Sequence, residues 1–186
     1  MGCAISGLGL APKNTTEAAS EDDAPHLTSE HIAMIKESWK VIQEDIAKVG
    51  IIVFVRLFET HPECKDVFFL FRDVEDLERL RTSKELRAHG LRVMSFIEKS
   101  VARLDQLERL DSLAVELGRS HYRYYAPPKY YGYVGTEFIC AKAWKTLFQY
   151  VTWLMRRGYN EEEEEAKRNN TVGSSRERPD KRNTAL

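Results

Sequence analysis

The sequence lacks a long apolar run, and it lacks an excess of charge of either sign. An uninterrupted apolar stretch such as Ile51 to Val55 is far too short to cross a bilayer, which takes about 20 apolar residues. Lysine and arginine number 28 and aspartate and glutamate number 29, so the net charge is −1. Domains that bind nucleic acid usually carry a concentrated basic charge. The composition therefore argues against a membrane-spanning chain, and we expect no nucleic-acid partner.

Cysteine is also scarce. The chain has three cysteines, which is no disulfide framework of the kind that small secreted domains use. Cys3 lies in a lipidation signal at the start of the chain, described below. Only Cys64 and Cys140 are then left as candidates for a disulfide. An inward-facing lipid anchor would also imply a reducing compartment, where thiols persist.

No stretch alternates apolar and polar residues in the way that a half-buried strand does. Apolar residues recur instead at steps of three and four, which is the spacing of one helical face. The pattern predicts an all-α domain of about six or more helices. Thr28 or Ser29 can cap the first helix, and Pro62 can open a later turn. The first apolar face comprises Ile32, Ile35, Trp39, Ile42 and Ile46.

The chain begins MGCAIS, which matches the pattern for N-myristoylation. Removal of Met1 leaves Gly2 at the N-terminus, and Ser6 completes the pattern. Cys3 offers a thiol for a second, palmitoyl chain. One myristoyl chain binds a membrane only weakly, whereas two acyl chains give a stable anchor. We expect acylation of both Gly2 and Cys3, with an ordinary flexible N-terminus as the alternative.

Composition divides the chain into three parts. Residues 1–27 are small, polar and interrupted by proline, and we expect an acylated flexible tether. Residues 28–158 carry the helical faces and are expected to form the one folded domain. Gly158 is expected to end the last helix. Residues 159–186, with consecutive glutamates at 161–165, are expected to form a disordered charged tail.

Two histidines lie on the apolar faces of two different predicted helices. His89 and His121 each follow apolar residues that are spaced by three and four. A single histidine on such a face is usually a satisfied core residue. Two of them, with Phe68 and Phe71 available to line a pocket, also suit the axial ligation of an iron porphyrin. The spacing alone leaves both interpretations open.

Around these histidines the sequence resembles the globin family. The stretch RLFETHPECKDVFFLF is similar to the globin B helix, C helix and CD corner, where a proline opens the C helix, as Pro62 would. A phenylalanine six residues later stacks on the haem in that family. The resemblance therefore implies that Phe68 contacts haem, with Phe71 near it.

The stretch ELRAHGLRV is similar to the globin E helix. By this likeness His89 corresponds to the distal histidine and Gly90 to the small residue where two helices cross. Val93 corresponds to the residue over the iron. Arg92 corresponds to a position that often faces a haem propionate.

The stretch LAVELGRSHYRYYAPPKYYGYVG is similar to the globin F helix, FG corner and start of the G helix. His121 corresponds to the proximal histidine, and Leu117 to the residue that packs beneath the porphyrin. Tyr131 and Val134 correspond to haem-lining positions. A histidine ligand normally donates its second ring hydrogen to an acceptor, and the Leu117 carbonyl, one turn back, is the expected one.

The resemblance covers roughly residues 28–158, because AWKTLFQYVTWLMRRG is also similar to the H helix. It implies the globin fold, a 3-over-3 helical sandwich around haem b (iron protoporphyrin IX). It implies iron held by His121, with His89 also able to coordinate it. In such six-coordinate globins O2, CO or NO binds after the distal histidine swings away, so the apparent affinity scales with the open fraction.

One segment departs from the family pattern. Val134 is followed only ten residues later by Trp144, where the sequence already resembles the H helix, and no proline or glycine lies between Thr136 and Arg157. The end of the G helix and the GH corner are expected to be missing, with the G and H helices shortened or merged into one helix from about Lys129. We expect such a chain to be less stable than a complete globin and to hold haem poorly.

Within globins, the MGC start and the polar tails are most similar to globin X, a membrane-attached relative of neuroglobin. This likeness implies attachment to the cytoplasmic face of the plasma membrane. The globin resemblance also implies that helix C and the middle of helix G lie in neighbouring regions. A redox-sensitive pairing of Cys64 with Cys140 therefore stays open.

Four functions remain open at this point. The first is redox or nitrite-to-NO chemistry at the iron, with a reductase as electron donor and no catalytic residue assigned. The second is reversible O2 storage or supply, and the third is a signalling module whose ligand state moves the E helix. The fourth is a helical scaffold without haem. A membrane tether and two iron-facing histidines argue against bulk O2 transport.

Overall fold

The computed structural model describes residues 24–68, 72, 74, 76–138 and 142–172. All regular elements in these ranges are helical, which confirms the predicted all-α class. Four residues singled out by the sequence, Gly2, Cys3, Phe71 and Cys140, lie outside the described residues, so acylation, the Phe71 contact and the Cys64–Cys140 pairing stay predictions. None of the described helices combines the length and apolar character needed to cross a membrane.

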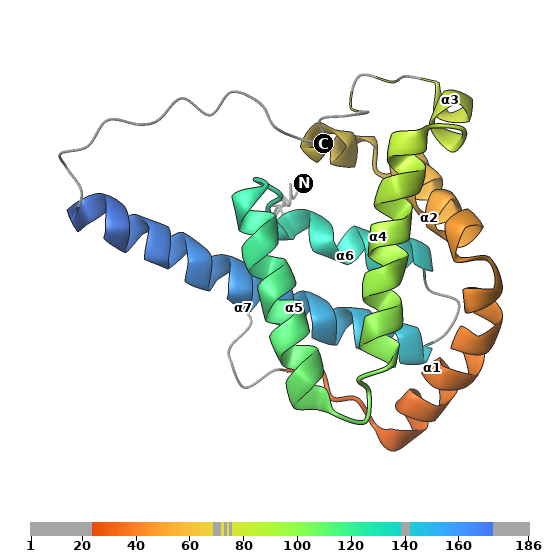
Figure 1. Ribbon diagram of the computed structural model, residues 1–186, viewed down its shortest axis with the longest axis horizontal. Coiled ribbons are helices and arrows are strands. Elements are labelled where there is room, and N and C mark those ends of the chain that lie inside the picture. Colours follow the sequence, from red (N-terminus) through yellow and green to blue (C-terminus); the bar gives the residue numbers. More distant parts are fainter. Residues whose placement is uncertain (1–23, 69–71, 73, 75, 139–141, 173–186) are drawn as a thin grey trace, which may run out of the picture.

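Seven α-helices are present in the described residues (Figure 1). Three short 3-10 turns connect some of them, at Gln43–Asp45, Pro62–Val67 and Pro128–Tyr130. The helices are α1 Ser29–Ile42, α2 Ile46–Thr60, α3 Leu77–Arg81, α4 Lys84–Val101, α5 Leu107–Arg123, α6 Tyr131–Phe138 and α7 Lys142–Val172.

The helix starts follow ordinary capping chemistry. The Thr28 hydroxyl accepts a hydrogen bond from the backbone N–H of His31, 3.2 Å away, and so caps α1, as the sequence predicted. The Ser83 hydroxyl does the same for α4 by accepting from the N–H of Leu86 at 3.2 Å. Pro62 opens the turn after α2, also as predicted. These caps fix where the helix that carries His89 begins.

The helices pack in two crossing layers. In Figure 1, α4 and α5 lie in front, and α6 and α7 cross behind them. The most extensive contacts join α5 to α7 and α2 to α4. Glycines allow both approaches: a Cβ built on Gly118 would lie 2.0 Å from the carbonyl oxygen of Met155, and one on Gly90 would lie 3.0 Å from the carbonyl carbon of Gly50.

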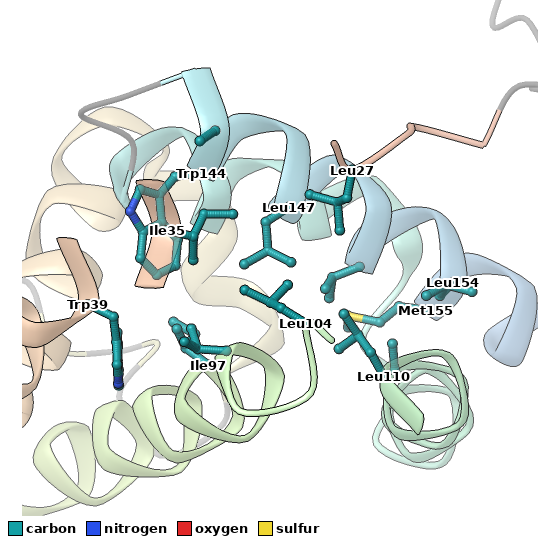
Figure 2. Packing of buried hydrophobic residues seen from close by; sticks show 14 of the residues in the cluster. Leu27, Ile35, Trp39, Ile97, Leu104, Leu110, Trp144, Leu147, Leu154 and Met155 are labelled. Carbon is teal, nitrogen blue, oxygen red and sulfur yellow. The ribbon is translucent and has the colours of Figure 1, made fainter. Parts of the chain in front are cut away.

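Two clusters of buried apolar side chains form the core. The larger cluster joins α1, α4, α5 and α7, and Figure 2 shows part of it, with Ile35, Leu110 and Leu154 fully enclosed. The smaller cluster lies between α2, α3 and α4 and includes Phe54 and Phe58. Val93 and Val134 each pack against both clusters, so both side chains lie where the two clusters adjoin.

The G and H equivalents are two helices and not one. A Cβ on Gly135 of α6 would lie 2.9 Å from the Cβ of Phe148 of α7, so the helices pack side by side. Thirteen residues of one continuous helix would separate these positions by about 20 Å. The prediction of one merged helix is therefore wrong. Helix α6, Tyr131–Phe138, is short.

The last helix does not end at Gly158. Helix α7 continues to Val172, so the predicted disordered tail is wrong for residues 159–172. The reason is tertiary: Gly158 packs against α5, where its added Cβ would lie 2.0 Å from the carbonyl oxygen of Val115. Glycine serves here for close approach and not as a helix stop.

Candidate functional site

The two histidines on apolar faces come from α4 and α5 and are electrostatically coupled. Both imidazoles are half-buried. Burial, the Arg92 guanidinium and the charge of His121 together lower the pKa of His89 to about 4. The effect of the His121 charge on His89 is in accord with the two side chains lying near one another. His89 is therefore neutral at physiological pH, which is the form that binds a metal.

His121 is held in one orientation by its own helix. Its Nδ1 lies 2.8 Å from the carbonyl oxygen of Leu117, one turn back, which confirms the predicted hydrogen bond. Because a carbonyl can only accept, Nδ1 carries the hydrogen and Nε2 keeps its lone pair. Burial lowers the pKa of His121, and the hydrogen bond to Leu117 opposes this shift. A histidine oriented in this way is ready to act as a ligand through Nε2.

Aromatic rings surround both histidines. The ring of His89 packs edge-on against Phe54, with centroids 4.8 Å apart, and against Phe68, at 5.1 Å. The ring of His121 packs edge-on against Tyr131 at 5.1 Å. The Tyr131 hydroxyl donates to the carbonyl oxygen of Ala126 at 3.0 Å, and burial raises the pKa of this tyrosine. Each imidazole is thus held by apolar ring contacts.

The other predicted pocket residues are near the same space. Phe68, Val93, Leu117 and Val134 are half-buried apolar side chains that pack against the two core clusters. Apolar side chains in the middle of a fold that keep part of their surface uncovered are suited to contact a large apolar ligand. Together with two neutral imidazoles, this lining fits an iron porphyrin, with His121 and His89 as the axial candidates.

Arg92 is an exposed neighbour of His89. The resemblance matched it to a position facing a haem propionate. In the structure a guanidinium nitrogen of Arg92 lies 3.4 Å from Nδ1 of His89, three residues earlier on the same helix, and the side chain is exposed. Arg92 is thus in contact with the predicted distal imidazole, and its contact with a haem propionate stays a prediction.

Sequence reasoning missed two contributors. Phe54 is buried and touches His89, but it stands within a mostly apolar helix where nothing in its spacing marks it out. The sequence pattern indicates a surface residue at His61, yet its ring stacks on Tyr133, with centroids 4.0 Å apart and planes 11° from parallel. Both contacts depend on how α2 packs against α4 and α6.

A separate groove of about 500 Å³ lies on the outer side of α2. Its lining includes Ile51, Ile52, Arg56 and Arg87, and none of the predicted site residues. The groove is therefore not the space between the histidines, and the chemistry of the two imidazoles identifies the candidate site.

Comparison with known proteins supports one family. The model of the Globin family matches residues 52–153. Cytoglobin-1 of Oryzias latipes is 34% identical over 106 residues, which cover 56% of this chain and 60% of that protein. Neuroglobin of Tetraodon nigroviridis is 27% identical over 147 residues, covering 72% of this chain and 92% of that protein. The chain thus spans about three fifths of the cytoglobin and most of the neuroglobin.

A solved structure has the same fold. The crystal structure of a hexacoordinated heme protein from an anhydrobiotic tardigrade superposes with a TM-score of 0.66 at 19% identity. The superposition covers 76% of this chain and 99% of the tardigrade chain. The helical arrangement in Figure 1 is therefore the globin fold, as the sequence predicted.

Proposed function

This chain belongs to the globin family, and we propose that it binds haem b with His121 and His89 as the two axial ligands. The observation that carries the proposal is the pair of half-buried imidazoles on α4 and α5, each packed against aromatic rings. His121 is oriented through the Leu117 carbonyl, and its Nε2 is left free. The tardigrade protein that shares this fold is a hexacoordinated heme protein, which supports the same coordination here.

The two histidines and the residues around them would have different roles in haem binding. His121 would hold the iron, and His89 would occupy the sixth position until it swings away. Phe68, Val93, Leu117 and Val134 would contact the porphyrin and exclude water, and Tyr131 would pack against the proximal imidazole. When bound, haem supplies an iron that takes O2, NO or CO as ligands. Since His89 competes for the same position, the apparent gas affinity would scale with the fraction of chain in which His89 is away.

We further propose a membrane-attached role of the globin X kind. The MGCAIS start would carry acyl chains on Gly2 and Cys3 and place the domain at the cytoplasmic face of the plasma membrane. At that surface the haem would exchange electrons with a reductase or convert nitrite to NO. A tethered, six-coordinate haem protein suits redox chemistry better than bulk O2 carriage, which needs a freely diffusing carrier.

The first experiment is an absorption spectrum of the purified full chain with one equivalent of haem, in ferric, ferrous and CO-bound forms. We expect a low-spin ferrous spectrum from the two histidines. His89→Leu should convert it to a five-coordinate, high-spin spectrum, and His121→Leu should abolish tight haem retention. A chain that takes up no stoichiometric haem, or whose spectrum is unchanged by both substitutions, would overturn the proposal.

The tether needs its own test. The full chain is expressed in animal cells with an alkynyl myristate analogue, and labelling and membrane fractionation are compared for the native chain, Gly2→Ala and Cys3→Ser. We expect Gly2→Ala to lose the label and the membrane association. We expect Cys3→Ser to keep the label but to dissociate readily, because a single myristoyl chain binds only weakly. Labelling of Gly2→Ala at the native level would exclude the acylation.

A further inference from the structure

Beyond Gly158, helix α7 runs along the end of α5 and contacts the turn that carries His121. The guanidinium of Arg119 lies 2.8 Å from a carboxylate oxygen of Glu161. The guanidinium of Arg123 lies 3.0 Å from a carboxylate oxygen of Glu162. Arg119 and Arg123 flank His121 by two residues on either side. The acidic residues therefore pair with both sides of the proximal turn.

An aromatic contact joins the same two helix segments. The rings of Tyr122 and Tyr159 meet edge-on, with centroids 5.2 Å apart. Tyr122 directly follows His121, and Tyr159 directly follows Gly158, where α7 comes against the backbone of α5. The ion pairs and this ring contact thus extend a backbone-to-backbone approach by about one further turn of α7.

The C-terminal end of this turn is exposed to solvent. Helix α5 ends at Arg123, and the next two residues, Tyr124 and Tyr125, are 80% and 88% exposed. Tyr125 has a φ of 57°, in the left-handed region that non-glycine residues seldom adopt. Helix ends fray unless something holds their last turn. The Ala126 N–H donates to the His121 carbonyl at 3.0 Å, and Tyr131 packs on the His121 ring. The contacts on the α7 side add to this support and tie the turn to a second long helix.

We infer that residues 159–162 of α7 form a latch that positions His121 for the iron. The latch acts on the ligand's own turn and touches neither haem nor gas. Arg123 also has Glu116 of α5 within 3.8 Å, but that carboxylate belongs to the same helix and cannot fix α5 relative to the rest of the fold. Glu162, whose side chain is only 20% exposed, is therefore the decisive residue. The hydrogen bond from Arg123 also lowers the pKa of Glu162, in accord with this pairing.

The inference rests on the proposed role of His121 as an iron ligand, and the test uses a charge reversal within the latch. Glu162→Lys breaks the pair with Arg123. Glu164→Lys is the matched control, because Glu164 lies on the same helix and is exposed. Arg123→Glu combined with Glu162→Arg restores the pair with its charges exchanged. All variants are made in the full chain, in a His89→Leu background so that His121 is the only protein ligand to the iron.

Two properties of the haem-bound chain are measured: the rate of haem loss to an excess of a haem-scavenging apoprotein, and the iron–histidine stretching band of the ferrous form by resonance Raman. We expect Glu162→Lys to lose haem about fivefold faster and to shift or broaden the band, with the exchanged pair close to the parent and Glu164→Lys unchanged. Faster haem loss with an unmoved band would mean that residues 159–162 only stabilise the fold, and it would overturn the positioning role. Equal behaviour of Glu162→Lys and Glu164→Lys would overturn it as well.

The haem-free chain separates this inference from the proposed function. Amide hydrogen exchange of residues 117–123 is compared without haem. We expect faster exchange of these amides in Glu162→Lys and not in Glu164→Lys. If the parent chain binds no haem, the proposed function fails. The amide exchange rates still test whether Glu162 holds the turn of residues 117–123. Equal exchange rates in Glu162→Lys and Glu164→Lys would overturn the latch.

Discussion

Arg92 donates toward Nδ1 of His89, 3.4 Å away, and this contact opposes coordination of His89 to iron. Arginine has only donors, so Nδ1 acts as the acceptor and a neutral imidazole then carries its hydrogen on Nε2. Coordination through Nε2 requires the hydrogen to move to Nδ1, which ends the contact with Arg92. The guanidinium therefore favours the tautomer of His89 that does not bind metal.

We predict that Arg92→Ala strengthens the bond between His89 and the iron. The ferrous chain should become more completely six-coordinate, and the rate of CO binding should fall about threefold, in line with the loss of one weak hydrogen bond. Stopped-flow CO binding measures this. Arg87→Ala, also on the exposed side of α4, should leave the rate unchanged. Faster CO binding in Arg92→Ala than in the parent would contradict the argument.

The crossing of α2 and α4 predicts a large difference between two glycine substitutions. A Cβ on Gly90 would lie 3.0 Å from the backbone of Gly50, whereas one on Gly132 would meet nothing within 4 Å. Both positions are helical, so alanine gains the same helix propensity at each. We expect Gly90→Ala to lower the free energy of unfolding by about 1–3 kcal/mol through overpacking. Gly132→Ala should raise it by about 0.5–1 kcal/mol.

Urea unfolding of the haem-free chain, followed by circular dichroism, measures both values. Because Gly90 is next to His89, Gly90→Ala should also alter the ferrous spectrum of the haem-bound chain, and Gly132→Ala should not. Equal stability of the two variants would mean that the crossing can relax without cost, and the close approach of the two helices would then have no role in placing His89.

The aromatic contacts of His89 predict an effect on ligand binding. Phe54→Leu removes a ring that packs edge-on against the imidazole, so His89 should leave the iron more readily and CO should bind faster, by about twofold to tenfold. Phe58→Leu is the matched control, since Phe58 is similarly buried and its ring packs on Phe68. Both variants should lose about 1–1.5 kcal/mol of stability. A similar acceleration in both would assign the effect to general loosening.

Local signals in the sequence were enough for the helices and for the proximal histidine. The Thr28 cap and the bond from His121 to the Leu117 carbonyl both follow from contacts three or four residues apart, which helix geometry brings together in any context. The family motifs predicted that His89 and His121 lie on two different helices, and they lie on α4 and α5. These parts depend little on how distant segments pack.

The sequence did not predict the features of the fold that depend on contacts between distant segments. The absence of glycine and proline after Thr136 favoured one merged helix, but Gly135 packs against Phe148 and the chain reverses. Gly158 looked like a helix stop followed by a charged tail. It instead fits α7 against Val115, and Glu161 and Glu162 pair with arginines some 40 residues earlier in the chain. A glycine that ends a helix and a glycine that allows close helix packing look the same in the sequence, and only the packed structure distinguishes them.

Cys64 predicts how stability depends on alkaline pH. Burial, with a smaller contribution from the charge of Glu63, raises the pKa of the Cys64 thiol from 9.0 to about 11. Between these values the folded chain keeps a proton that the unfolded chain loses, so the free energy of unfolding contributed by this group falls as pH rises from about 9 to 11. Below that window the thiol is protonated in both states and has no effect. Urea unfolding at several pH values, in a Cys3→Ser, Cys140→Ser background, measures the slope.

Cys64→Ala should make this slope shallower. The lost sulfur also removes apolar burial, but that cost is the same at every pH and leaves the slope unaffected. Tyrosines such as Tyr131 and Tyr150, whose pKa values burial also raises, titrate in both chains, so only the difference between the two slopes belongs to Cys64. Equal slopes would mean that the thiol ionises as easily in the folded chain as in the unfolded one. The cluster of Phe54, Phe58 and Leu80 around Cys64 would then admit water, and the apolar wall behind His89 would be more open than its burial indicates.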